Sequence, residues 1–311
     1  MSAAVWPDLP YPAWRDTAAT LQLWTQIVGK VRLALTPWVN HSWQVPFYVT
    51  ARGLGTSPIP IGSEILEIEF DFIGHRLVAR TSRGENRTLL LEPQTVADFY
   101  RRVIALLNEI GVAVAVNEMP NEVANPIRFS QDHSHATYDD AAAHRFWRAL
   151  VQADRVFKLF RSGFVGKASP VHFFWGSFDL AVTRFSGRKA PPHPGGVPGL
   201  PDAVAREAYS HAVSSAGFWP GNDVFPRAAF YSYAYPEPAG FCSRPVTTGA
   251  TFDVTLGEFI LPYDTVRDAA EPDALLLDFL ATTYAAAADA GGWDRAALEC
   301  DMGVPARVRP I

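Results

Sequence analysis

The chain has few of the residues on which several common kinds of protein depend. Only two of its 311 residues are cysteines, Cys242 and Cys300, whereas a secreted domain that relies on disulfide bonds usually carries more. No CxxC motif is present, which argues against a thiolate zinc site. Charged residues (19%) and apolar residues (48%) are close to the globular average, so a disordered chain and a coiled coil are excluded.

Positive charge is also scarce. Lys and Arg number 27 against 32 Asp and Glu, which gives a net charge of −5, and the basic residues form no long run. Nucleic-acid binding draws much of its affinity from concentrated positive charge that neutralises phosphates. The sequence therefore predicts a protein with no nucleic-acid partner.

Long apolar runs are absent. No apolar stretch is long enough to span a membrane. The N-terminal sequence MSAAVWPDLPYPAW has neither the cationic start nor the apolar region of a signal peptide. We expect a cytoplasmic protein without membrane association, and the sequence gives no indication of its oligomeric state.

Hydrophobic periodicity predicts both helices and strands. Leu66, Ile68, Phe70 and Phe72 alternate with polar residues, and Gly74-His75 suits a two-residue turn that sets Phe72 opposite Leu77 and Phe70 opposite Ala79. Apolar spacings of three and four predict helices over 13–35 and 139–161, with further helices from Pro93, near 202–213 and from Pro272. Further strands are predicted at 112–116, 171–185 with a bend at Gly176, 227–235, 251–256 and 258–262.

These elements recur in the same order in two parts of the chain. Local motifs coincide as well, since Leu23-Trp24 matches Phe146-Trp147 in its surroundings, although amphipathic elements of any origin also look alike. We predict an α+β fold with an internal duplication, in which each half has an antiparallel sheet flanked by helices. The halves are 1–116 and 137–311, packed as one unit and joined by an irregular connector, 117–136. A Pro/Gly-rich insertion near 187–226 lengthens the second half.

Candidate site residues gather in the second half. Regular alternation in a strand over 171–185 places Trp175, Ser177 and Asp179 on one face, opposite His172. Such a face suits a pocket wall in which Asp179 orients a base or binds a cation. In the alternative, Asp179 forms an ion pair with Arg184 or Arg52.

Aromatic residues are dense between 218 and 235. Tyr231 and Tyr233 share one face of a strand, Trp219 lies shortly before them, and His211 lies upstream. Rings and hydroxyl groups together are typical of a ligand pocket, although tyrosine is also a good former of half-exposed strands. Glu258 is the one acid at the start of an otherwise apolar strand.

The segment Asp132-His133-Ser134-His135 has the H-x-H spacing of some metal sites, with Glu118 and Glu122 upstream. Two exposed loop histidines would give the same pattern, and we predict no bound metal. No G-x-S-x-G motif or phosphate-binding glycine loop is present, so neither a standard serine nucleophile nor a nucleotide cofactor is indicated. We expect no cofactor.

Several longer motifs resemble a bacterial family known under a domain-of-unknown-function label. They are HFFWGSFDLAVTRFSGR (172–188), WTQIVGKVRLAL (24–35), VPFYVTARGL (45–54), REAYSHAVSSAGFWPGN (206–222) and FYSYAYPEP (230–238). The resemblance covers nearly the whole chain and implies a stand-alone protein of about this length. It implies no activity and no catalytic residue.

The sequence leads to one main hypothesis of function, an enzyme that performs acid/base chemistry on a small organic molecule. The predicted catalytic residues are His172, Asp179, His211 and Glu258; the predicted ligand-binding residues are Trp43, Trp175, Ser177, Trp219, Tyr231 and Tyr233. The alternatives are a non-catalytic protein that binds a small molecule and a structural protein that binds a partner through its aromatic surface.

Overall fold

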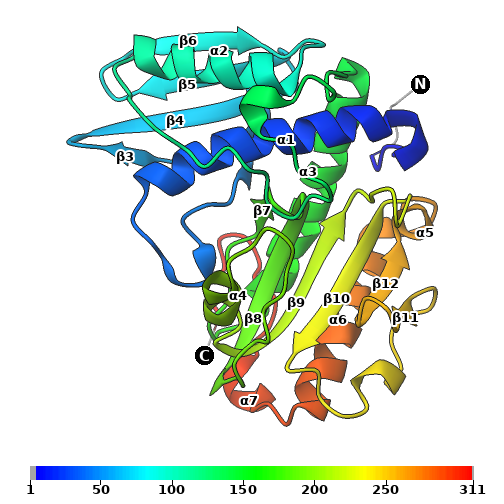
Figure 1. The fold of residues 1–311 in the computed structure, drawn as a ribbon. Coiled ribbons are helices and arrows are strands. Elements are labelled where there is room, and N and C mark those ends of the chain that lie inside the picture. Colours follow the sequence, from blue (N-terminus) through cyan, green and yellow to red (C-terminus); the bar gives the residue numbers. More distant parts are fainter. Residues whose placement is uncertain (1–4, 310–311) are drawn as a thin grey trace.

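The computed structural model describes residues 5–309 and has an α+β fold in two similar halves (Figure 1). Residues 1–4, the start of the N-terminal sequence considered above, and residues 310–311 lie outside the described part. Each half has a six-stranded antiparallel sheet, here called the N-terminal sheet and the C-terminal sheet. Between residues 5 and 309, no helix is both long enough and apolar enough to cross a membrane.

The N-terminal half begins with the helix α1 (Tyr11–Leu35), as the apolar spacing of 13–35 predicts. The sheet that follows has the strand order β1-β2-β4-β5-β6, with β3 paired to β4, and α2 (Val96–Glu109) packs against it. Its strands are β1 (Tyr48–Val49), β2 (Gly53–Gly55), β3 (Ile59–Ile61), β4 (Glu64–Asp71), β5 (Arg76–Thr81) and β6 (Asn86–Leu90).

The meander of the N-terminal sheet is present, but the predicted register is wrong by two residues. Phe70, not Phe72, lies opposite Leu77. The turn is longer than two residues because the Asp71 carboxylate accepts hydrogen bonds from the N–H groups of Ile73 and Gly74. An aspartate that caps its own turn in this way sets the register more strongly than glycine alone.

The C-terminal half begins with α3 (Asp140–Ser162), capped by Asp139, as predicted. Its sheet has the strand order β11-β12-β10-β9-β8-β7. The strands are β7 (His172–Phe174), β8 (Asp179–Lys189), β9 (His211–Trp219), β10 (Ala229–Tyr235), β11 (Thr251–Asp253) and β12 (Glu258–Pro262). The other helices are α4 (Asp202–Ala208), α5 (Tyr263–Arg267), α6 (Pro272–Ala290) and α7 (Arg295–Leu298).

Four local predictions are wrong. The expected long strand 171–185 is instead a hairpin, in which β7 and β8 pair across a turn where Phe178 has φ +61°. The strand β9 was not predicted, because its small residues are poor strand formers. Residues 112–116 form no strand, and α2 starts at Val96 with Thr95 as its cap rather than at Pro93.

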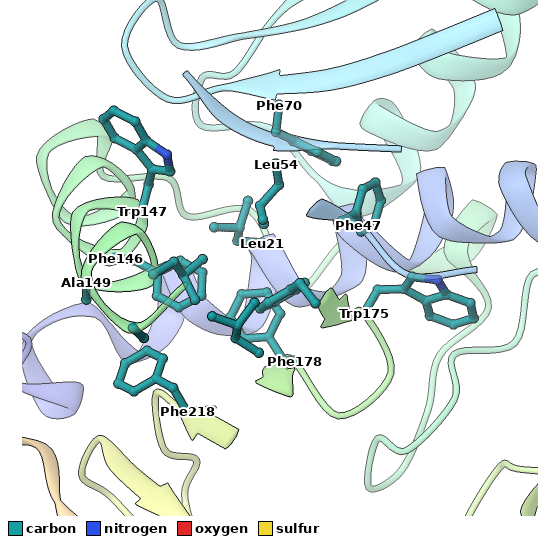
Figure 2. Close-up of a cluster of buried hydrophobic side chains, with 14 of the residues drawn as sticks. Leu21, Phe47, Leu54, Phe70, Phe146, Trp147, Ala149, Trp175, Phe178 and Phe218 are labelled. Atoms are coloured by element: carbon teal, nitrogen blue, oxygen red, sulfur yellow. The ribbon is translucent and has the colours of Figure 1, made fainter. Parts of the chain in front are cut away.

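The two halves are connected by backbone hydrogen bonds and by a shared hydrophobic core. Phe47 and Phe173 exchange two backbone hydrogen bonds of 2.8 Å, which link β1 of one sheet to β7 of the other. Figure 2 shows the shared core around Leu21 of α1, where Phe47 and Phe70 of the first half approach Phe146 and Phe178 of the second. The internal duplication itself stays a prediction.

The helices α3 and α6 cover one face of the C-terminal sheet and lie behind it in Figure 1. The opposite face, here called the open face, carries Asp179 and Thr183 of β8, Tyr231 and Tyr233 of β10, and Glu258 of β12, because residues opposite each other in register share a face. Three segments extend over parts of this face: the connector 117–136, the insertion around α4, and the loop that precedes β1.

Candidate functional site

Asp179 lies at the start of β8 and is the most buried acid of the open face, with 6% of its surface exposed. Its carboxylate accepts hydrogen bonds from the hydroxyl groups of Ser177 and Tyr231. No lysine or arginine between residues 5 and 309 forms an ion pair with it. Burial therefore raises the pKa of Asp179, and the two hydroxyl donors offset this only in part.

The alternative in which Asp179 pairs with an arginine is wrong. Arg52 binds Asp71 in the other half, with 2.9 Å between Nη2 and Oδ2. The Arg184 guanidinium lies on the helix-covered face, 3.6 Å from the centre of the Phe160 ring, and donates to the Phe160 carbonyl. Asp179 thus accepts hydrogen bonds from two hydroxyl groups and does not form the ion pair with Arg184 or Arg52 that the alternative predicted.

A row of tyrosine side chains begins at Tyr231, which donates to Asp179, and continues through Tyr233 to Tyr209. The Tyr231 ring lies on Gly217, where any larger residue would overlap it, and stacks on Tyr233 with 6.1 Å between ring centres. The hydroxyl of Tyr233 is 2.9 Å from that of Tyr209, which follows α4. Burial raises the pKa of all three phenols, so each is protonated at neutral pH.

Glu258 begins β12 on the same face and is half-buried. Burial, together with the negative charges of Asp179 and Asp253, raises its pKa to about 7. The structure therefore places Glu258 near Asp179 and the tyrosines.

Glu122 is a second acid that the sequence argument did not assign to this site. It comes from the connector, and its carboxylate lies against Gly176, where a Cβ atom would overlap Oε1. Burial and the charge of Asp179 raise its pKa to about 7. The connector thus adds a third carboxylate to the two from the sheet.

A polar row on α1 positions this connector. Gln22, Gln26 and Lys30 recur every four residues and so share one side of the helix. Gln26 exchanges two hydrogen bonds of 2.8 Å with the backbone of Asn121, and Lys30 donates to the Met119 carbonyl at 2.5 Å. Gln22 donates to the Gly176 carbonyl at 2.7 Å, beside the turn that carries Ser177. This buried row is the sequence signal that could have identified Glu122.

Together these side chains form what we call the acidic recess: Glu122, Asp179, Glu258, Tyr209, Tyr231 and Tyr233. Glu122 is exposed, whereas Glu258 and the tyrosines are half-buried, and the surrounding protein shifts the pKa values of all these groups. In the part of the chain that the structure describes, no three His, Cys, Asp or Glu side chains lie close enough together to hold one metal ion. The carboxylates therefore influence one another's charge across the recess without sharing a single ion.

Five predicted site residues lie away from the recess: His172, Trp175, Trp219, Trp43 and His211. His172 is buried between Trp43 and Phe174, and burial, together with Arg32 and Arg161, lowers its pKa to about 3, so it is neutral. Regular alternation predicted that His172 and Asp179 lie on opposite faces. The hairpin instead places both on the same face of the sheet.

Trp175 and Trp219 also have other surroundings. Trp175 packs directly on Gly29 of α1 and donates to the Val45 carbonyl at 3.1 Å, so it belongs to the core. Trp219, at the end of β9, stacks on Phe225.

Trp43 and His211 lie at the other end of the open face. The ring centre of His211 is 6.4 Å from that of His41, and His41 in turn lies 5.2 Å from Trp43. These two residues thus share a face with Asp179 and Tyr231 but lie away from the recess.

The H-x-H segment has a structural role. Asp132 accepts a hydrogen bond of 2.7 Å from His135, and its other carboxylate oxygen accepts backbone N–H groups. The carbonyls of Asp132 and His135 accept from Ala97 and Val96, the first residues of α2. The segment therefore caps α2, and His133 is exposed.

Two cavities lie elsewhere. One, of about 600 Å³, is lined by residues that include His75, Glu92 and Tyr138. The other, of about 380 Å³, is lined by residues that include Arg188, Tyr235 and Trp293. Neither contains the carboxylates of the acidic recess.

Comparison with known proteins gives a family and no activity. No curated protein and no solved structure matches the chain significantly. A family model, described as a family of unknown function (DUF5996), matches residues 6–300. This span is nearly the whole chain, and the protein therefore belongs to the DUF5996 family.

Proposed function

We propose that the protein is an enzyme that performs general acid–base catalysis on a small polar organic molecule bound in the acidic recess. One observation carries this proposal: two solvent-accessible glutamates, Glu122 and Glu258, have pKa values of about 7, which the charge of the buried Asp179 helps to raise. Asp179 itself forms no ion pair with a cation among residues 5–309. Carboxylates that serve only stability are usually paired with a cation, whereas perturbed carboxylates in a recess are typical of catalytic sites.

A pKa near 7 suits proton transfer in both directions. At neutral pH each glutamate is present in both forms, so one can donate a proton while the other accepts one. Asp179 acts on both, because its negative charge contributes to raising each pKa. Asp179 is therefore a positioning and tuning residue in this proposal, and Glu122 and Glu258 are the catalytic pair.

The tyrosines would bind and orient the substrate. Tyr209 and Tyr233 share a hydrogen bond, and the stacked rings of Tyr231 and Tyr233 form an aromatic wall beside the carboxylates. Rings give apolar contact and hydroxyl groups fix orientation, a combination common in small-molecule sites. Hydrolysis and isomerisation are the reaction classes that such a set of residues supports.

A non-catalytic function is the second candidate. The extended tyrosine wall would also suit a protein that binds a small molecule without changing it.

We further propose that the protein acts in the cytoplasm, in line with the free thiols of Cys242 and Cys300.

The test is turnover of a defined panel. Purified protein is incubated with 4-nitrophenyl esters, glycosides and anilides and with small hydroxy and keto compounds, and products are measured by absorbance and mass spectrometry. We expect at least one compound to be converted, with a loss of at least about 100-fold in Glu122→Gln and Glu258→Gln. Glu67→Gln, which changes an exposed glutamate of β4 in the other half, serves as the control.

Two results would count against an enzyme. Conversion that both glutamate variants retain would exclude the recess as the active site. Saturable binding to the recess without conversion would instead favour the non-catalytic protein.

A further inference from the structure

The far end of the open face holds a lysine in unusual surroundings. Ser169 donates its N–H to the Thr183 carbonyl, and Phe185 donates to the Lys167 carbonyl, so the segment of Lys167 pairs alongside β8. Lys167 therefore projects from the open face beside Phe185. Phe185 and Asp179 are six residues apart on β8, or about 20 Å along an extended strand, so this lysine is well separated from the acidic recess.

The nearest polar neighbour of Lys167 is a neutral histidine. Its Nζ lies 2.6 Å from Nε2 of His41. Nδ1 of His41 is 3.0 Å from the Ala208 carbonyl, and because a carbonyl only accepts, Nδ1 carries the ring hydrogen. Nε2 therefore presents its lone pair to Lys167 and is positioned to accept its proton.

Aromatic rings enclose the amine on two sides. Nζ lies 5.2 Å from the centre of the Trp43 ring and 4.9 Å from that of Phe185. The charged and titratable groups nearby are His41, His211 and Glu207, and the Glu207 carboxylate accepts a hydrogen bond of 2.6 Å from Trp38. Burial lowers the pKa of Lys167 despite the opposing charge of Glu207, so the neutral amine is more populated than in an ordinary lysine.

The other three lysines lack this combination. Lys30 is buried and bonded to the connector, and Lys158 forms an ion pair of 2.6 Å with Asp154. Lys189 is exposed, and although it lies opposite His211 in register, its amine forms no hydrogen bond with a histidine in the part of the chain that the structure describes. Among the four lysines, Lys167 alone joins accessibility to a proton acceptor and aromatic walls.

We propose that Lys167 is a reactive amine that forms imines with aldehydes or ketones, with His41 as its proton acceptor. The neutral Nζ attacks the carbonyl carbon, and the carbonyl π electrons move to oxygen. His41 accepts one of the two protons of the now cationic nitrogen and passes it to that oxygen, which gives the carbinolamine. The second nitrogen proton reaches the hydroxyl group by the same route, the C–O bond breaks, water leaves, and the nitrogen lone pair forms the C=N bond. Both nitrogen protons thus end in the water molecule, and no oxidant or reductant takes part.

The experiment traps the imine. The folded protein is treated with benzaldehyde and sodium cyanoborohydride at pH 7, and the rate of benzylation at each lysine is measured by peptide mapping. We expect Lys167 to react at least ten times faster than Lys189. His41→Asn should slow Lys167 about tenfold and leave Lys189 unchanged, because asparagine tolerates the φ of +62° found at His41 but accepts no proton there.

The proposal is overturned if Lys167 reacts no faster than Lys189, or if His41→Asn leaves its rate unchanged. The first comparison needs no variant, so it holds even if the substitution affects folding. Glu122→Gln provides a separate control: it should leave the rate at Lys167 unchanged whether or not the acidic recess is catalytic.

Discussion

The acidic residues of the two sheets differ in whether they form ion pairs. In the N-terminal sheet the carboxylates of Asp71, Glu69 and Glu64 form ion pairs with arginines of 2.9, 3.2 and 2.6 Å. In the C-terminal sheet Asp179 and Glu258 have no such partner among residues 5–309. The fold thus compensates the negative charges of the first sheet with arginines and leaves those of the second uncompensated, and this contrast underlies the proposed acid–base function.

The largest expected effect comes from matched aspartate substitutions in the two sheets. Asp71→Asn should lower the free energy of unfolding by about 3 kcal/mol, because it removes two charge-assisted hydrogen bonds to Arg52 and Arg76. Asp179→Asn should cost less than about 1 kcal/mol at pH 8, because burial already disfavours the ionised carboxylate there. Urea unfolding measures both, and an equal loss in the two variants would remove the contrast between the sheets.

The next prediction compares a glycine-to-alanine substitution in each of the two sheets. A methyl group at Gly217 overlaps the Tyr231 ring, so Gly217→Ala should cost about 2 kcal/mol and displace the phenol from Asp179. At Gly55, in the N-terminal sheet, the added methyl group lies 3.1 Å from Cγ2 of Thr50, a side chain that can shift. Gly55→Ala should therefore cost less than about 1 kcal/mol. Thermal unfolding compares them, and a smaller loss at Gly217 than at Gly55 would contradict the packing argument.

The smallest expected effect is a change in pH dependence. The pKa of Glu258 is about 7 in the folded protein, above its ordinary value of 4.5. Protonated Glu258 therefore makes its full contribution to the free energy of unfolding below about pH 4.5. This contribution is lost as the pH rises through 7 and the carboxyl group ionises in the folded protein. Glu258→Gln avoids this loss and should be more stable than the wild type by about 1 kcal/mol at pH 8, after allowance for solvent screening, and equally stable at pH 4.5.

Glu69→Gln is the control for that measurement. It removes the ion pair with Arg80 and should show no gain in stability at pH 8. If Glu258→Gln behaved in the same way, Glu258 would be a structural acid like those of the N-terminal sheet.

Local patterns predicted the fold class and most elements, but they missed the geometry of two turns and one strand that depends on its neighbours in the sheet. Helices α1 and α3 follow from apolar spacing alone. The register of the β4–β5 hairpin depends on the side chain of Asp71, and the 171–185 hairpin depends on a turn with Phe178 at positive φ. The strand β9 owes its existence to its central place in the sheet, where Gly217 makes room for Tyr231.

The candidate site was predicted only in part, because strand alternation identifies residues on one face of a sheet but not an acid that comes from a distant segment. Asp179, Tyr231, Tyr233 and Glu258 lie on neighbouring strands, so alternation brings them onto one face. Glu122 comes from a connector that Gln26 holds in place over a sequence separation of 95 residues. The polar row on α1 indicates that this side of the helix has a polar partner, but it does not identify the segment that supplies it.

The most direct test of the account is an NMR titration of the glutamate side chains, with ¹³C labels at their carboxyl carbons. The account predicts that Glu122 and Glu258 titrate with midpoints near pH 7, that each signal is missing in its own glutamine variant, and that both midpoints fall in Asp179→Asn. If every glutamate of the folded protein titrates below about pH 5, the carboxylates of the recess are ordinary surface acids and the proposed acid–base function is wrong.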